Sequence, residues 1–357
     1  MDEGISLFRA IELGDLSQVK RIIENKKEEG VIDFNEVTGQ GTIINYAVEN
    51  GTFEIVEYLI NCEINLEGSE TTPLIDINFS FEDGLTPLIT ACIHQKPRIV
   101  KLLISKGAAL ELKDYDGDTA LLNAVIGESS AIIEDLLNAG ANINVKNNDG
   151  YTPLHKSCML SNRDLVNLFI RRGANLEIKD SDGDTPLLTA CAYGNMGGSS
   201  AIIEDLLNAG ANINKKNNDG YTPLHKSCMI SNRELVNLFI RRRANLEIKD
   251  SGGDTPLLTA CAYGNMDIIS DLLDAGANTY VKNNNQHDIF EIIENNQTID
   301  ERGKDIIRTK IDMLRTSTMN KLYDIPEGGG KKRRKTKKIK KRSKRKSKKR
   351  SKKSKKK

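Results

Sequence analysis

One ten-residue stretch recurs along this chain and constrains its fold more than any other feature. Its clearest copy covers residues 149–158, DGYTPLHKSC. Asp-Gly predicts a tight turn, Thr152 can cap a helix, and Pro153 then occupies the first helical position, where its missing N–H costs nothing. Ser157 and Cys158 are small and let that helix approach a neighbour closely. The stretch therefore predicts a turn, a capped helix and a packing face in one module.

The copies are regularly spaced. Their threonines are Thr42, Thr86, Thr119, Thr152, Thr185, Thr222 and Thr255, separated by 44, 33, 33, 33, 37 and 33 residues. A period of 33 residues together with a T-P-L-H motif is the signature of the ankyrin repeat. The chain resembles that family over residues 1 to about 297. Its near-identical repeats and Gly-led basic tail also resemble ankyrin proteins encoded by large DNA viruses.

The resemblance implies an all-α solenoid of about eight helix–turn–helix repeats, with β-hairpin-like turns along one edge. We expect an N-terminal capping repeat at 1–41 and the array at 42–287. A capping half-repeat and helix follow at 288–325, and a disordered Lys/Arg/Ser-rich tail at 326–357. Insertions are predicted near residues 67–77 and 195–200. With no apolar run long enough to span a membrane and no signal peptide, we expect a monomer that is cytoplasmic or nuclear and not secreted.

Two sequence details concern the backbone. Most second helices end at a glycine, such as Gly173, which can adopt a left-handed conformation. Glu63 and Arg243 stand at that position instead, at a cost of about 1 kcal/mol each if the backbone stays left-handed. Residues 129–196 and 199–266 differ at five of 68 positions, which indicates a tandem duplication joined near residues 197–198.

The net charge of +2 conceals an uneven distribution of positive and negative charge along the chain. Residues 331–357 hold 21 Lys or Arg and no acid, which leaves 31 basic and 50 acidic residues in 1–330. The repeats therefore carry about −19 and the tail about +21 at neutral pH.

No catalytic motif is present, and we expect neither an enzyme nor a cofactor. His155 and His225 occupy the ordinary T-P-L-H position, where the ankyrin resemblance implies hydrogen bonds within and between repeats. Five cysteines lie six residues after a repeat threonine and are predicted to be small buried residues. A zinc site would pair each His with the Cys three residues later, and two ligands fall short of the four that structural zinc requires. Asp149, Asp182 and Asp219 are interpreted as supports of their own turns.

Without a catalytic or metal site, the candidate functional feature is a binding surface. In the ankyrin family, partners bind the concave side, and by position this implies hairpin tips and first helices here. The candidate partner-binding residues are Tyr115, Asp116, Asp118, Tyr151, Met159, Asp182, Asp184, Tyr193, Tyr221, Met229, Asp254 and Tyr263. Tyr and Met favour binding, and the carboxylates favour a basic protein partner. The alternative is that the Asp residues only solvate turns.

The tail leaves two classes of function open. Lys331, Lys332, Arg333, Arg334 and Lys335 form a run typical of nuclear targeting or of polyanion association. In the first class the protein is a non-enzymatic adaptor, and the tail localises it. In the second class it is a nucleic-acid-binding protein that contacts RNA or DNA without sequence preference through the tail. Aromatic residues are absent from the tail, so sequence-specific recognition is not expected.

Overall fold

The computed structural model describes residues 6–29, 42–64, 72–73, 75–80, 83–193 and 199–323. The basic run at 331–335, the rest of the predicted tail and the duplication junction lie outside the described residues, as does most of the predicted insertion near 67–77. The chain divides into two compact units, Met1–Asp300 and Glu301–Lys357. This division falls inside the segment 288–325 that the sequence assigned to a single cap.

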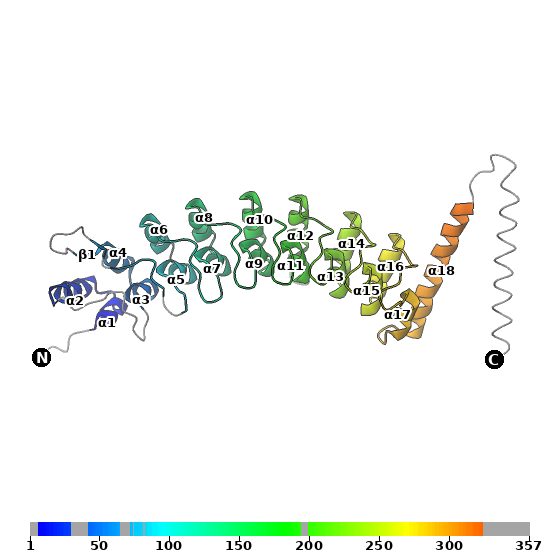
Figure 1. Cartoon of the computed structure of the whole chain (residues 1–357), viewed down its shortest axis with the longest axis horizontal. Coiled ribbons are helices and arrows are strands. Elements are labelled where there is room, and N and C mark those ends of the chain that lie inside the picture. Colours follow the sequence, from blue (N-terminus) through cyan, green and yellow to red (C-terminus); the bar gives the residue numbers. More distant parts are fainter. Residues whose placement is uncertain are drawn as a thin grey trace. The chain divides into compact units, whose positions relative to one another are not determined.

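The first unit is a stack of helix pairs (Figure 1). The first helices of the pairs are α1 (Leu7–Glu12), α3 (Ile43–Asn50), α5 (Pro87–Ile93), α7 (Ala120–Ile126), α9 (Pro153–Met159), α11 (Pro186–Ala192), α13 (Pro223–Met229), α15 (Pro256–Tyr263) and α17 (Ile289–Asn295). The second helices are α2 (Leu16–Glu29), α4 (Phe53–Asn61), α6 (Pro97–Ser105), α8 (Ser130–Asn138), α10 (Arg163–Arg171), α12 (Ser199–Asn208), α14 (Arg233–Arg241) and α16 (Met266–Asp274). The predicted helical solenoid is confirmed.

The sequence signals explain where the first helices begin. The Thr152 hydroxyl accepts from the His155 backbone N–H, and the His155 ring lies within hydrogen-bond distance of the Thr152 backbone N–H, which forms a capping box. The same pair recurs at Thr222 and His225. Thr119 is the exception, because its side chain makes no capping bond.

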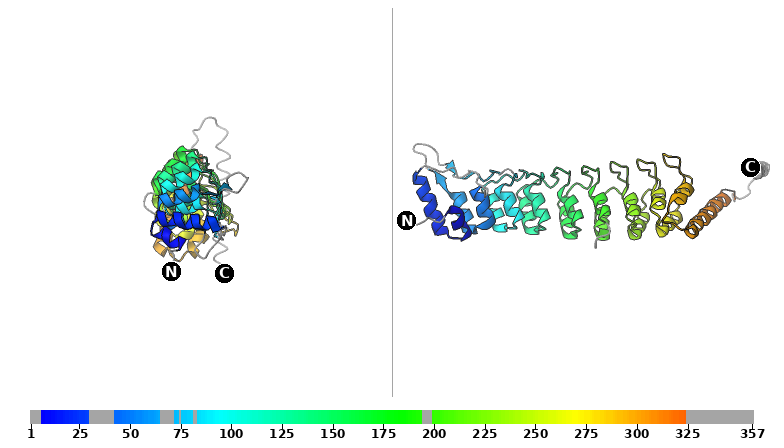
Figure 2. Two further views of the ribbon diagram at one scale, coloured as in Figure 1. Left: turned by 90° about the vertical axis from the view of Figure 1, so that its left-hand side faces the viewer. Right: turned by 90° about the horizontal axis from the view of Figure 1, so that it is seen from below.

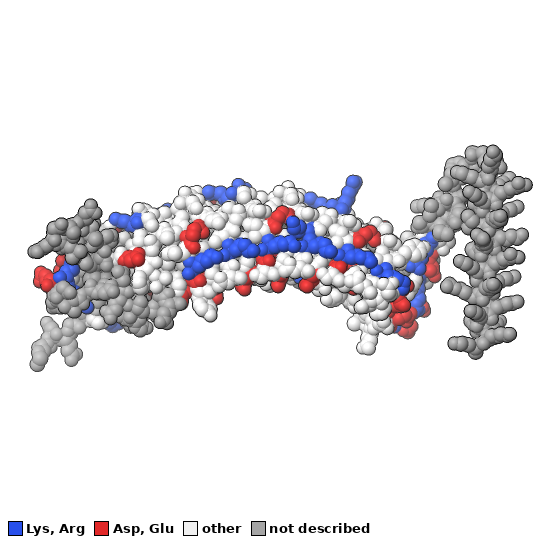
Figure 3. Space-filling view, viewed as in Figure 1, with Lys and Arg blue, Asp and Glu red and all other residues white. Residues whose placement is uncertain are grey.

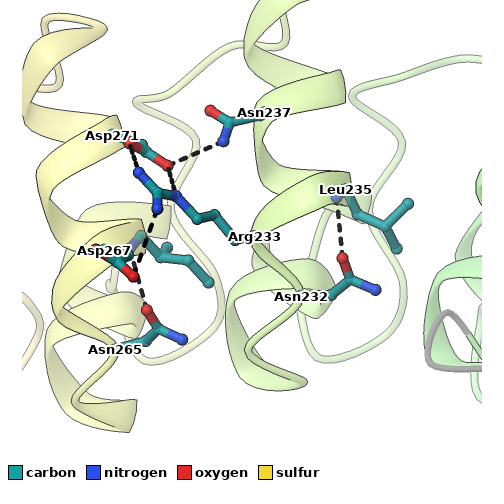
Figure 4. Close-up of polar contacts among 8 residues, drawn as sticks. Asn232, Arg233, Leu235, Asn237, Asn265, Asp267 and Asp271 are labelled. Atoms are coloured by element: carbon teal, nitrogen blue, oxygen red, sulfur yellow. Dashed lines mark hydrogen bonds and ion pairs between the residues drawn. The ribbon is translucent and has the colours of Figure 1, made fainter.

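The core lies between the two layers of helices. In α10 the residues Leu165, Val166, Leu168 and Phe169 are all buried. Each second helix packs against its own first helix, and neighbouring repeats contact through both layers. On the outer layer Arg233 of α14 binds Asp271 of α16 through two N–H groups, at 2.6 and 2.9 Å, and Asn237 donates to the same carboxylate (Figure 4). Arg163 and Asp205 repeat this contact between α10 and α12.

The turns between repeats lie along one edge of the unit, beside the two layers of helices (Figure 2). Backbone hydrogen bonds join each turn to the next, for example from the Asn148 N–H to the Asp116 carbonyl at 3.1 Å and from the Ser181 N–H to the Asp149 carbonyl at 2.9 Å. The turns approach so closely that a Cβ at Gly150 would lie 2.9 Å from the Asp180 Cα.

Of the two residues that replace the helix-ending glycine, one differs from the sequence-based expectation. Glu63 forms strand β1 (Glu63–Ile64), which pairs antiparallel with β2 (Thr72–Pro73). Its backbone is therefore extended and the predicted strain is absent there. Arg243, in contrast, has a φ of 60°, where its sister Gly173 has 81°. The second unit contains α18 (Glu301–Tyr323), which lies within the segment 288–325 where the sequence predicts a half-repeat and a helix.

Candidate binding surface

The first helices present apolar side chains at their carboxyl ends. Seven or eight residues after each repeat threonine from Thr86 onward stand Ile93, Ile126, Met159, Leu160, Tyr193, Met229, Ile230 and Tyr263, which we call the apolar row. Ile126 and Tyr263 are 46% and 49% exposed, and Ile93 and Leu160 are also exposed. The other members are half-buried. The row recurs in successive repeats, and these helices lie along the inner side of the curved stack (Figure 1).

The hairpin tips, around residues 115–118, 148–151, 181–184 and 218–221, lie next to the amino ends of the same helices. Tyr115 is 82% exposed, and Asp116, Asp149, Asp182 and Asp219 are exposed as well. Tyr151 and Tyr221 are half-buried. The ammonium groups of Lys156 and Lys226 lie 5.3 and 5.8 Å from the centres of these two rings. The inner surface of the first helices is thus bounded by tip residues and by the apolar row.

Two predicted members of the surface are buried. Asp118 and Asp184 are hardly exposed, and the Asp184 carboxylate lies 3.5 Å from the Lys226 ammonium of the next repeat. One oxygen of each carboxylate has no hydrogen-bond partner among the described residues. Burial raises the pKa of both groups, and the nearby lysine opposes this shift. These side chains connect repeats and do not face a partner, contrary to the expectation. Asp254 is half-buried, and burial raises its pKa too.

The turn interpretation of Asp149, Asp182 and Asp219 is also wrong in detail. The supporting side chain belongs to the residue two positions earlier. Asn147 Oδ1 accepts from the Tyr151 N–H at 2.9 Å, and Asp180 Oδ1 accepts from the Asp184 N–H at 2.8 Å. The three tip carboxylates therefore remain exposed at the surface.

The histidines and cysteines belong to the core. His155 Nε2 lies 3.1 Å from the Asp184 carbonyl of the next repeat, and His225 makes the equivalent contact with Asp254. This confirms the predicted bonds within and between repeats. Burial lowers the pKa of His155 to about 4. The cysteines are buried and unpaired, and burial raises the pKa of the Cys158 thiol. Within the described ranges no group of three His, Cys, Asp or Glu residues is placed to hold a metal.

Sequence reasoning missed a row of lysines on the hairpin side. Lys113, Lys146, Lys179, Lys216, Lys249 and Lys282 precede successive turns, and we call them the lysine row. Each of the first five donates from Nζ to the backbone carbonyl of the next member, at 2.7–2.8 Å. Figure 3 shows a continuous line of basic side chains there, with acidic side chains on both sides. The spacing of these lysines matches that of the repeat threonines, so the signal was present in the sequence.

The comparisons with known proteins agree with this architecture. The family model "Ankyrin repeats (3 copies)" matches residues 74–147, 123–197 and 192–283, and "Ankyrin repeats (many copies)" matches residues 7–60. The chain belongs to the ankyrin repeat proteins. A solved structure similar to this ankyrin array is the ankyrin repeat domain of Bcl-3, a member of the IkappaB protein family. It is 24% identical with a TM-score of 0.51, and the match covers 77% of this chain and 100% of that one. No curated protein matches the chain.

The remaining finding concerns membranes. Among the helices of the described ranges, none is both long and apolar enough to cross a bilayer.

Proposed function

We propose that this ankyrin repeat protein is a non-enzymatic adaptor, which holds a protein partner on the inner surface of its first helices. The observation that carries the proposal is the apolar row. Exposed or half-exposed Ile, Leu, Met and Tyr side chains recur at one or both of two adjacent positions, seven and eight residues after the repeat threonine, in the six consecutive repeats that begin at Thr86. Contiguous exposed apolar surface marks interaction sites, and Tyr and Met are enriched in them.

The tip residues specify the chemistry of the partner. Tyr115 projects from its turn, and the carboxylates of Asp116, Asp149 and Asp182 are exposed beside the same surface. A partner with apolar side chains over the apolar row and basic side chains near the tips would complement both. Because Asp118 and Asp184 are buried, the proposal excludes them and relies on the exposed tip carboxylates.

Affinity capture of the full chain tests the proposal. The test variant carries Ile126→Ser, Leu160→Ser and Tyr263→Ser. The control variant carries Lys106→Ser, Arg171→Ser and Arg241→Ser, at exposed positions at the carboxyl ends of second helices. Nuclease treatment removes proteins that are retained only through nucleic acid on the basic tail. We expect the test variant to lose the captured partner and the control variant to keep it. Equal retention by both variants would contradict the proposal.

The tail supports a second element of the proposal, which rests on charge alone. With 21 basic residues in 331–357, this segment would direct the adaptor to the nucleus or to polyanions. Removal of residues 331–357 separates the two open classes. The adaptor class predicts mislocalisation with the protein partner retained, whereas the nucleic-acid-binding class predicts loss of all binding.

A further inference from the structure

The lysine row consists of fixed positive charges at a regular spacing. An ammonium has three N–H donors, and for Lys146, Lys179 and Lys216 one of them is directed to the next carbonyl, at 2.7–2.8 Å. Because each long side chain is already held in one geometry, a ligand that binds the row loses less conformational entropy than it would on free lysines. The remaining donors are available, since Lys146 and Lys216 are exposed and Lys179 is half-buried.

Acidic groups flank the row and restrict the width of any ligand. On the tip side, Asp116, Asp149, Asp182 and Asp219 are exposed in successive turns. Two residues before Lys113, Lys179 and Lys249 stand Glu111, Glu177 and Glu247, which accept backbone N–H groups of the following repeat. Figure 3 shows the basic line between these acidic side chains. A broad anionic surface, such as a duplex or a membrane, would bring negative charge against both flanks.

The spacing restricts the ligand further. Packed helices are separated by about 8–10 Å, so the row offers about one charge per 10 Å. A nucleic acid strand carries a phosphate about every 3.4 Å, so about two of every three phosphates would lack a lysine. A polyproline II segment has three residues per turn and a rise of about 3.1 Å per residue. It presents every third side chain on one face at about 9.3 Å, which matches the row.

We propose that the lysine row binds an extended acidic protein segment, with Asp or Glu at about every third residue opposite successive lysines. This surface lies on the hairpin side and is distinct from the apolar row, so the inference does not depend on the proposed adaptor site. The segment would lie along the stack and cross several repeats. The affinity of the segment would come from several ion pairs, each of which contributes little by itself.

The probe for the test is a fluorescein-labelled peptide of six Glu-Pro-Pro triplets, titrated with the full chain at about 50 mM salt. A second peptide has the same composition with the six Glu contiguous, and an oligodeoxythymidine supplies the nucleic acid comparison. The row variant carries Lys146→Gln, Lys179→Gln and Lys216→Gln. The matched control removes three positive charges at the carboxyl ends of second helices through Lys106→Gln, Arg171→Gln and Arg241→Gln. Both variants keep the basic tail, which adds the same background binding to each, so a difference between them reports on the row.

We expect the row variant to weaken binding of the spaced peptide about five- to tenfold, which is about 0.3–0.5 kcal/mol for each of three ion pairs and is ordinary for pairs at a protein surface. The control variant should bind the spaced peptide with an affinity within about twofold of that of the wild type. The same is expected of a variant that keeps the charge through Lys146→Arg, Lys179→Arg and Lys216→Arg. Equal losses in the row and control variants would overturn the proposal. So would an equal loss for the contiguous peptide or the oligonucleotide, because either result shows general attraction of polyanions. If the triple variant is unfolded by circular dichroism, Lys179→Gln is compared with Arg171→Gln, with a loss of about twofold expected for Lys179→Gln alone.

Discussion

At the scale of single residues, buried polar groups connect one repeat to the next. The His155 ring caps its own helix through Thr152 and reaches the Asp184 carbonyl of the following repeat. The imidazole is fully buried, and burial lowers its pKa to about 4. The unfolded chain, with an ordinary histidine pKa, takes up a proton near pH 6.5 and the native state does not. The neutral His155 side chain therefore makes its full contribution to the free energy of unfolding above about pH 6.5. This contribution is lost as the pH falls toward 4.

The direction of this change in stability with pH leads to a prediction. His155→Gln keeps a residue that can form a capping box but does not titrate. We expect the difference in unfolding free energy between the wild type and this variant to shrink by about 2–3 kcal/mol between pH 7 and pH 4. Urea denaturation at both pH values measures it, and the carboxylates contribute equally to both proteins. A difference that does not change with pH would refute the assignment.

Arg243 gives the second prediction at this scale. Its φ of 60° is a left-handed conformation that costs a side chain about 1 kcal/mol. A Cβ at Gly173 would meet no atom within 4 Å, so the cost at the equivalent position comes from the backbone and not from crowding. We expect Arg243→Gly to stabilise the protein by about 0.5–1 kcal/mol in urea denaturation.

The control for Arg243 is Arg241, the last residue of α14, where the backbone is helical. Arg241→Gly should destabilise by up to about 1 kcal/mol, because glycine costs conformational entropy in a helix. If both substitutions destabilise, Arg243 is not strained in solution.

At the scale of elements, the repeats differ in how their first helices are capped. The Thr152 hydroxyl lies 2.7 Å from His155 Nδ1 and accepts from the His155 N–H. The Thr119 hydroxyl is buried with no hydrogen-bond partner among the described residues, and Ala120 replaces the usual proline. The same residue type therefore contributes differently in two repeats.

The pair Thr152→Val and Thr119→Val tests this difference with one chemical change. Thr152→Val should cost about 1–2 kcal/mol, because a cap is lost. Thr119→Val should change stability by less than about 0.5 kcal/mol or increase it, because a buried hydroxyl without a partner is removed. Thermal and urea unfolding measure both. Equal losses would show that the Thr119 hydroxyl finds a partner in solution.

The elements show what the sequence could predict. Caps and turns are local signals, so the starts of α9 and α13 were predicted correctly. The burial of Asp184 depends on Lys226, which lies 42 residues later and one repeat further along the stack. The strand pairing of β1 with β2 depends on an inserted segment with no repeat pattern. A contact between repeats decides the first case and a segment outside the repeat pattern decides the second, so the sequence of one repeat contains neither.

At the scale of the whole molecule, charge is divided between the repeats and the tail. Residues 331–357 hold 21 basic residues, whereas residues 1–330 carry an excess of acid. We expect weak binding to unrelated DNA duplexes with no sequence preference and a steep loss of affinity as salt rises, because counterions are released. Fluorescence titrations at several salt concentrations test this.

Two variants separate the sources of DNA binding. Deletion of 331–357 should abolish it, and Lys146→Gln, Lys179→Gln and Lys216→Gln together should leave it nearly unchanged. A flat salt dependence, or a strong preference for one duplex, would contradict a role for the tail that depends only on charge.

The central claim is that a protein partner binds the inner surface of the first helices, and hydrogen–deuterium exchange of the full chain with and without its captured partner tests it most directly. The account predicts slower exchange at the carboxyl ends of α7, α9 and α15 and in the tips around Tyr115 and Asp149. The second helices α10 and α14 should exchange as in the free protein. Protection confined to the second helices or to the tail would contradict the account.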